Sequence, residues 1–176
     1  MINDLIQRFM LKTRYAIIGF DVDTSELTFL TYGSRGTFKR SLMDVSLDTS
    51  LVSDLDVTQA CYLGLKMAEF LQYKNEPMTP KQEVQARRVP QGVAHQVSFD
   101  RHGHVIYVDP ESDIMVSQSA LLIAKNDTLL RKFSPDMGYA IGLYAGKRLY
   151  VKPTAIALTS SAPIYVDNVV DLQPRR

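Results

Sequence analysis

The clearest indication of the fold is the run Val93-Ala-His-Gln-Val-Ser-Phe-Asp-Arg-His-Gly-His-Val-Ile-Tyr-Val-Asp109. Apolar and polar residues alternate on both sides of the pair His102-Gly103, which is typical of a β-hairpin. With this pair as the turn, we expect Phe99 to face Ile106 and Val97 to face Val108. The run therefore predicts two paired strands in the middle of the chain.

All three histidines of the chain, His95, His102 and His104, lie in this hairpin. His95 and His104 share a sheet face, but six residues separate His95 from Arg101, the residue expected opposite His104. At about 3.3 Å per residue, the two imidazoles would lie roughly 20 Å apart, too far for one metal ion. We therefore expect no metal centre, and we expect Asp100, His102 and His104 to form a solvated turn.

Further strands are expected at 15–22, 27–32 and 37–45, which are rich in β-branched and aromatic residues and are separated by turn-forming segments. They predict an antiparallel meander. The stretch Asp56-Val-Thr-Gln59 has the residues of a helix capping box. Apolar residues then recur at helical spacing, so we expect a packed central helix from there to about Tyr73.

The other segments are less regular. Residues 112–133 fit either a helix ending near Asn126 or a hairpin turning at Asn126-Asp127, and we favour the helix. Short apolar runs at 139–144, 148–152, 155–158 and 164–170 are punctuated by Gly and Pro, which predicts a β-rich C-terminal third. No internal repeat or low-complexity tract is found.

Two further segments are expected to lie at the surface: an N-terminal amphipathic helix and a long polar loop at 74–91. The apolar face of this helix is expected to pack either on its own sheet or on another subunit; it consists of Ile2, Leu5, Ile6, Phe9 and Met10. Residues 74–91 contain three prolines and the basic pair Arg87-Arg88, which predicts a loop. Residues 1–176 are thus expected to form a single, mainly antiparallel α+β domain.

The composition excludes several classes of protein. Twenty Lys and Arg against 19 Asp and Glu give a formal charge of +1, so no global field attracts nucleic acid or an anionic membrane. Basic pairs are scattered, which leaves nucleic acid as a less favoured partner. No apolar run approaches the roughly 18 residues of a membrane span, and no signal peptide is recognisable. We expect a soluble protein, either cytoplasmic or assembled in a particle.

The only cysteine, Cys61, falls within the pattern of the central helix, so we expect it to be a small buried hydrophobic residue rather than a nucleophile. No sequence motif of nucleophilic catalysis or phosphate binding is present.

Asp21 and Asp23 follow a predicted strand, and residues two apart in a strand project to one face, where carboxylates could bind a divalent cation. Three strands, a helix and a later strand ending in Asp109 resemble the first half of the ribonuclease H-like fold. That resemblance implies a magnesium-dependent nuclease with Asp21, Asp23 and Asp109 as its acidic residues. The only acidic residue available on the helix is Glu69, and the β-rich C-terminus has no counterpart in that fold.

The favoured interpretation is a non-catalytic subunit that binds protein partners or itself, in a homo-oligomer or a larger assembly such as a virus particle. Short strands, an amphipathic helix and a long loop are features that subunit interfaces commonly use. The expected interface residues are Leu5, Ile6 and Phe9 on the helix face, and Arg87 and Arg88 in the loop. No cofactor is expected in this interpretation, whereas the nuclease alternative requires magnesium.

Overall fold

The structure is a computed structural model that describes residues 13–72, 82–83 and 91–150. The first half comprises β1 (Tyr15–Asp21), β2 (Glu26–Thr31), β3 (Thr37–Ser41), α2 (Leu42–Leu47), α3 (Thr49–Ser53) and α4 (Val57–Gln72). The second half comprises β4 (Gln82–Glu83), β5 (His95–Phe99), β6 (His104–Val108), β7 (Met115–Ser119), α5 (Ala120–Ala124), α6 (Asp127–Leu130) and α7 (Pro135–Tyr150). The mixed α+β architecture expected from the sequence is confirmed.

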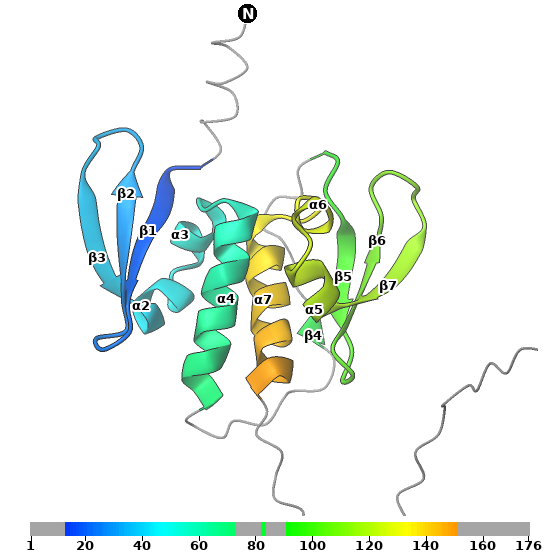
Figure 1. Cartoon of the computed structure of the whole chain (residues 1–176). Coiled ribbons are helices and arrows are strands. Elements are labelled where there is room, and N and C mark those ends of the chain that lie inside the picture. Colours follow the sequence, from blue (N-terminus) through cyan, green and yellow to red (C-terminus); the bar gives the residue numbers. More distant parts are fainter. Residues whose placement is uncertain (1–12, 73–81, 84–90, 151–176) are drawn as a thin grey trace, which may run out of the picture.

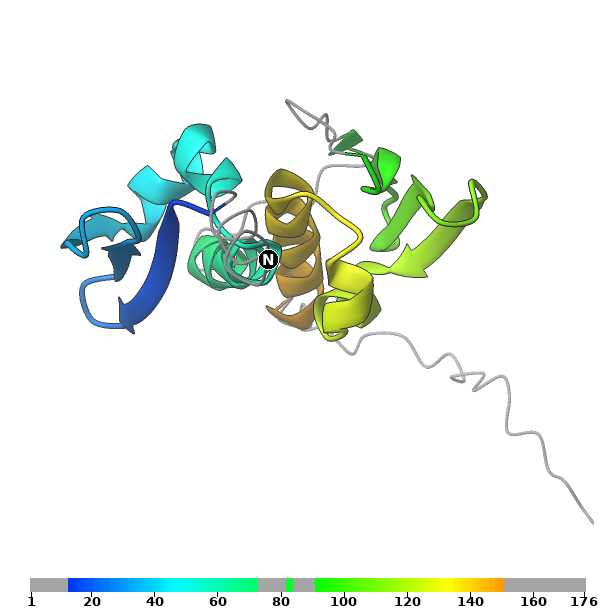
Figure 2. The same ribbon diagram turned by 90° about the horizontal axis from the view of Figure 1, so that it is seen from above.

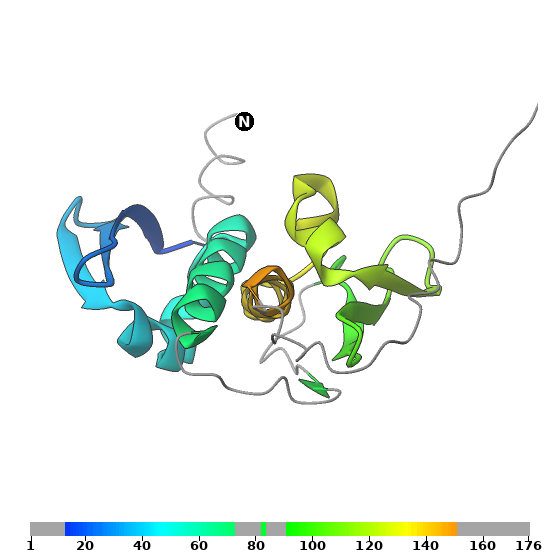
Figure 3. The ribbon, with the colours of Figure 1, turned by 60° about the horizontal axis from the view of Figure 1, so that its bottom comes forward.

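The strands form two separate antiparallel sheets on opposite sides of a helix pair. The first sheet has the order β1-β2-β3, and the second has the order β4-β5-β6-β7. Figures 1 and 2 show α4 and α7 side by side in the middle, with one sheet on each flank. Both helices begin at the same end of the molecule, and α7 lies between α4 and the second sheet (Figure 3).

The two halves repeat the same order of elements at a constant offset in residue number. From β2 to α4 the elements begin at positions 26, 37, 42, 49 and 57, and from β6 to α7 they begin at 104, 115, 120, 127 and 135. The second series is the first one shifted by a fixed amount, which we call the repeat offset. Only the first strand of each half, β1 and β5, departs from this offset. Phe20 of β1 pairs with Leu27, whereas Phe99 of β5 pairs with Val105. The β5–β6 turn is therefore one residue shorter than the β1–β2 turn.

Individual hydrogen bonds repeat with the elements. The Thr31 amide donates to the Gly36 carbonyl, and at the repeat offset the Asp109 amide donates to the Ile114 carbonyl, both at 2.9 Å. The helix caps repeat as well. Asp48 and Asn126 are equivalent, as are Asp56 and Ser134, and each of these four side chains accepts a backbone amide hydrogen bond at the start of its helix. Such agreement in detail shows that the two halves form an internal structural repeat, which we call the duplication.

The sequence conceals this duplication. Of the 47 pairs formed by residues 26–72 and 104–150, six are identical: Ser34 with Ser112, Ser41 with Ser119, Leu51 with Leu129, Gly64 with Gly142, Leu65 with Leu143, and Leu71 with Leu149. No repeat is found in the sequence, in keeping with so few identities, but the order of the elements shows that the fold contains one. Apolar character and caps suffice to specify each element, so the residues themselves could diverge.

Close packing between α4 and α7 holds the halves together. A Cβ atom added at Gly64 would collide with the carbonyl oxygen of Tyr139, and one added at Gly142 would collide with that of Cys61. These two contacts are equivalent, since the repeat offset relates Gly142 to Gly64 and Tyr139 to Cys61. The interface is thus isologous within one chain, as in a two-fold symmetric dimer.

Each half has a core, and each core includes residues of the helix pair. In the first, Leu27 and Phe29 of β2 join Leu63 and Met67 of α4; all four are buried. In the second, the buried members include Phe99, Val105, Tyr107, Ile141 and Tyr144. Because Leu143 of α7 packs against the first core and Cys61 of α4 belongs to the second, the helix pair is part of both.

Several expected elements differ from those observed. The strands predicted at 139–144 and 148–152 are wrong where the structure describes them, because residues 135–150 form α7. Its glycines, interpreted as strand punctuation, are instead the small residues that face α4: Gly138, Gly142 and Gly146. The strand expected at 37–45 ends at Ser41, whose hydroxyl accepts the Asp44 amide and starts α2.

The segment 112–133 and the central hairpin were each predicted in part. The helix favoured for 112–133 is present only as α5 and α6, since β7 occupies 115–119. In the hairpin Phe99 pairs with Val105, one position away from the predicted partner, because Gly103 adopts φ +82° and the turn is wider than the His102-Gly103 pair alone. The segments 155–158 and 164–170, most of the 74–91 loop and the N-terminal helix lie outside the described residues.

Candidate interaction surfaces

Strand β7 has an uncharged outer edge with exposed apolar residues at its start. Ile114 and Met115 are 62% and 63% exposed, and among the described residues β7 is paired only with β6. Strand β7 has the sequence Met-Val-Ser-Gln-Ser, with no charged residue. An uncharged strand edge offers its backbone to another strand, because nothing on it repels a neighbour.

The free backbone groups of β7 follow from its pairing. The Asp109 amide donates to Ile114 and the Ala120 amide donates to Gly103, and the pairing with β6 has no irregularity between them. Hydrogen-bonded and non-hydrogen-bonded pairs alternate in an antiparallel ladder. The amide and carbonyl groups of the alternate residues therefore point away from β6; these residues are Met115, Ser117 and Ser119.

The duplication supplies a reference for this edge, because β3 occupies the equivalent position in the first half. Strand β3 has the sequence Thr-Phe-Lys-Arg-Ser, so Lys39 stands where Ser117 stands in β7. Lysine at the centre of an edge strand is a common obstacle to unwanted pairing. The first half carries that obstacle and the second half lacks it.

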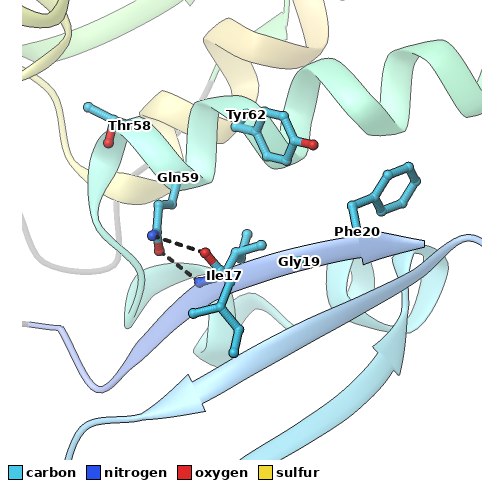
Figure 4. Close-up of a pocket in the computed structure, with 7 residues that line it drawn as sticks. Ile17, Gly19, Phe20, Thr58, Gln59 and Tyr62 are labelled. Atoms are coloured by element: carbon cyan, nitrogen blue, oxygen red, sulfur yellow. Dashed lines mark hydrogen bonds between the residues drawn. The ribbon is translucent and has the colours of Figure 1, made fainter. Parts of the chain in front are cut away.

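A second surface is an open cleft between β1 and the start of α4 (Figure 4). Its volume is about 400 Å³, and its lining residues are Ile17, Ile18, Gly19, Phe20, Thr58, Gln59 and Tyr62. The register of β1 against β2 shifts between Ile17 and Gly19, so Ile18 lies at a bulge and is 55% exposed. Tyr62 is 39% exposed on the facing helix. The cleft is therefore mostly apolar.

Gln59 ties the outer edge of β1 to α4. Its side-chain oxygen accepts the Ile17 amide at 3.1 Å, and its side-chain nitrogen donates to the Ile17 carbonyl at 3.5 Å (Figure 4). The predicted capping box is therefore only half present: Asp56 accepts the Thr58 amide at 2.9 Å, but Gln59 bonds with the strand. The sequence shows a Gln at the capping position and cannot show this more distant partner.

Replacing Gln59 with Leu should destabilise the protein by about 1–3 kcal/mol, because the half-buried Ile17 amide would lose its acceptor. Gln59→Glu keeps an acceptor for the Ile17 amide at neutral pH but loses the 3.5 Å bond to the Ile17 carbonyl, so it should cost less than Gln59→Leu and serves as the comparison. Urea unfolding measures both variants. Equal stability of Gln59→Leu and the wild-type protein would show that this contact contributes nothing.

Aromatic residues and a lysine border the cleft. The Lys66 ammonium group lies 5.4 Å from the ring centroid of Phe20 and 5.9 Å from that of Tyr62, within cation–π range. Lys66 also pairs with Glu69 at 2.9 Å. Glu69, the helix carboxylate of the nuclease alternative, is thus engaged in an ion pair on the helix surface.

The predicted acidic residues are not brought together. Asp21 ends β1 in the first sheet, whereas Asp109 follows β6 in the second sheet, on the other side of the helix pair (Figure 1). Asp21 accepts the amides of Asp23 and Thr24 as a turn residue. The hydrogen bond from the Thr24 amide contributes most to lowering the pKa of Asp21. A ribonuclease H-like core would instead place the later strand in the same sheet as β1.

Asp109 is a structural anchor. One of its oxygens accepts the Glu111 amide at 2.8 Å, and the other lies 2.8 Å from the ammonium group of Lys132. The bond from Lys132 lowers the pKa of Asp109, and the same bond raises the pKa of Lys132. This ion pair joins the β6–β7 turn to the segment before α7.

His102, His104 and Cys61 occupy structural positions. The amides of His102 and His104 both donate to Asp100 at 2.8 Å, so this carboxylate organises the exposed turn. Cys61 is 2% exposed, which confirms the prediction of a buried residue. Burial, followed by the charge of Asp127, raises the pKa of its thiol to about 12. No cluster of three metal-binding side chains occurs among residues 13–72, 82–83 and 91–150.

The expected interface residues Leu5, Ile6, Phe9, Arg87 and Arg88 lie outside the described residues. Among the helices that the structure does describe, none combines the length and apolar character needed to cross a membrane. No family model, curated protein or solved structure matches this chain.

Proposed function

We propose that this protein is a non-catalytic assembly subunit that associates with itself, and that the outer edge of β7 is the contact between copies. The observation that carries the proposal is the contrast between β7 and β3. Strands β3 and β7 occupy equivalent positions in the two halves, and each is the outermost strand of its sheet. Only β3 has a lysine at its centre.

A second copy fits this edge because antiparallel pairing of β7 with itself is self-complementary. With Ser117 opposite Ser117 of the second copy, Met115 of each copy lies opposite Ser119 of the other. These are the residues whose backbone groups point outward, so the two edges would form about six hydrogen bonds. Opposed serines and the exposed Met115 give favourable cross-strand contacts, and no like charges meet. Such pairing closes as a two-fold dimer, from which larger assemblies can be built.

The remaining interface residues stay part of this proposal. We propose that the basic pair Arg87-Arg88 and the apolar residues Leu5, Ile6 and Phe9 provide additional contacts with a neighbouring subunit. The β7 edge does not depend on them, because its exposure and its free backbone groups belong to described residues.

The test transfers two β3 residues to β7 in the variant Met115→Thr/Ser117→Lys. Both positions are exposed, and β3 accommodates the same two residues at equivalent places, so the fold should be retained. Gln118 is left unchanged because it accepts a hydrogen bond from the Tyr107 hydroxyl at 3.0 Å. Light scattering at several concentrations should show association of the wild-type protein and a monomeric variant.

The matched control is Leu47→Lys. Leu47 is a highly exposed residue at the end of α2, and its counterpart at the repeat offset is Lys125, so the lysine is tolerated at that place. This control should associate like the wild-type protein. A wild-type protein that stays monomeric at all concentrations, or a double variant that associates equally well, would overturn the proposal.

A further inference from the structure

The β5–β6 turn and the last turn of α7 bring basic side chains together. Figure 1 shows this turn at the end of the molecule where α7 ends. Within the turn, Nε of Arg101 donates to Nε2 of His102 at 3.2 Å. A Cβ atom added at Gly103 would lie 2.6 Å from Nε and 3.1 Å from Cγ of Arg148, which belongs to α7. The Arg148 side chain therefore lies directly against the turn.

Gly103 makes this close approach possible. Its φ of +82° is in the left-handed region that favours glycine, and the missing Cβ atom leaves room for Arg148. Successive Cα atoms are about 3.8 Å apart, so those of Arg101 and Gly103 lie within about 7.6 Å of each other. An arginine side chain spans a comparable distance. Both guanidinium groups can thus reach one small ligand at the turn.

The duplication shows which parts of this turn are shared by the two halves. Asp21 and Asp100 directly follow the equivalent phenylalanines of β1 and β5, and each organises its turn by accepting two amide hydrogen bonds. The first turn continues with Val-Asp-Thr-Ser at 22–25, which contains no basic residue. The repeat offset relates Arg148 to Phe70, which packs against the first core. An equivalent turn thus forms without either arginine.

The two arginines have hydrogen-bond donors to offer a ligand. Within the described part of the chain, neither Arg101 nor Arg148 forms an ion pair with a carboxylate. A guanidinium group has five N–H donors, and Arg101 uses one of them on His102. Asp100 is engaged by the turn itself, since one oxygen accepts two amides and the other lies 3.1 Å from Nδ1 of His104. The planar donor groups of arginine match the oxygens of a phosphate group.

The surroundings of the turn favour a compact anion over an extended one. Strands β4, β5, β6 and β7 contain no lysine or arginine. A nucleic-acid backbone requires cationic contacts along its length, and the sheet beside the turn does not supply them.

We propose that Arg101 and Arg148 bind a phosphate group of a small molecule, with His102 as the positioning residue that orients Arg101. The second half of the molecule is then the half that carries the ligand, because the first half has no arginine at either equivalent place. This inference goes beyond the proposed assembly role and does not depend on it, since the β7 edge contributes no residue to the site.

Calorimetric titration of the full chain with pyrophosphate at physiological salt tests the site. Arg101→Gln and Arg148→Gln should each weaken binding at least about tenfold, because each removes one of two charge-assisted contacts. The matched control is Arg131→Gln, which removes the same charge at an exposed position directly after α6, at the other end of α7 (Figure 1). This control should bind pyrophosphate like the wild-type protein.

The outcomes separate a ligand site from a structural one. Weaker binding by Arg101→Gln and Arg148→Gln, with circular dichroism unchanged, supports the proposal. If Arg148→Gln does not fold, Arg101→Gln decides, because Arg101 is exposed in the turn. A wild-type protein that binds no pyrophosphate, or equal binding by all three variants, would overturn the proposal.

Two further measurements keep this proposal distinct from others. A mixed-sequence oligonucleotide that binds more tightly than pyrophosphate, and loses affinity in the same variants, would overturn the small ligand and assign the arginines to nucleic acid. Self-association at β7 is measured separately with Met115→Thr/Ser117→Lys, and this variant should bind pyrophosphate like the wild-type protein. The failure of one proposal therefore leaves the other intact.

Discussion

Replacing either Gly64 or Gly142 with Val should lower the free energy of unfolding by about 3 kcal/mol, the upper end of the usual cost of overpacking. At both sites the added Cβ atom would meet backbone of the other helix, and backbone cannot move aside as a flexible side chain can. Helix propensity acts in the opposite direction, because Val is slightly better than Gly inside a helix, and this gain is well below about 1 kcal/mol. The steric effect is the larger of the two, so both substitutions should destabilise the protein.

The two substitutions should also act alike, because Gly64 and Gly142 occupy equivalent places in one isologous interface. Gly33→Ala is the control, since no heavy atom lies within 4 Å of the added Cβ atom there. Chemical denaturation followed by circular dichroism gives the three values. If Gly64→Val and Gly142→Val were as stable as Gly33→Ala, α4 and α7 would not pack as closely as described.

Leu63→Ala and Ile141→Ala should each cost about 2–5 kcal/mol, the range for deleting a fully buried aliphatic side chain. Leu63 and Ile141 are both 0% exposed, and they are related by the repeat offset. Leu63 belongs to the core of the first half, and Ile141 belongs to that of the second. A large loss at both positions is expected because each half depends on its own core.

Leu149→Ala provides the matched control for these two variants. Leu149 lies on α7 near its C-terminal end and is 49% exposed, so much of its side chain is already in water. Its removal should cost clearly less than either core substitution in the same urea titration. A control that is as destabilising as Ile141→Ala would contradict the assignment of the second core.

The sequence predicts those elements whose information is local. The helix Val57–Gln72 follows from apolar spacing after Asp56, and the strands of the first meander follow from their β-branched and aromatic residues. Helix α7 could not be recognised in this way, because its glycines are selected by contact with α4 rather than by helix propensity. The sequence of α7 alone does not show that α4 packs against it.

The interaction surfaces illustrate the same limit. Nothing local in Met115–Ser119 distinguishes a free edge from an interior strand; its exposure depends on which strands flank it. The contrast with Lys39 becomes meaningful only when the two halves are aligned, and six identities in 47 pairs are too few to suggest that alignment. Likewise, Asp21 and Asp109 both end predicted strands, and only the topology reveals that they belong to different sheets.

The measurement that tests the proposed function most directly is amide hydrogen exchange at Ser117 over a range of protein concentrations. The amide of Ser117 points away from β6, so it should exchange rapidly in dilute solution and slowly where copies pair through β7. Protection that grows with concentration in the wild-type protein, and is missing in Met115→Thr/Ser117→Lys, is the result we predict. Rapid exchange at every concentration would show that β7 remains a free edge and would contradict the account.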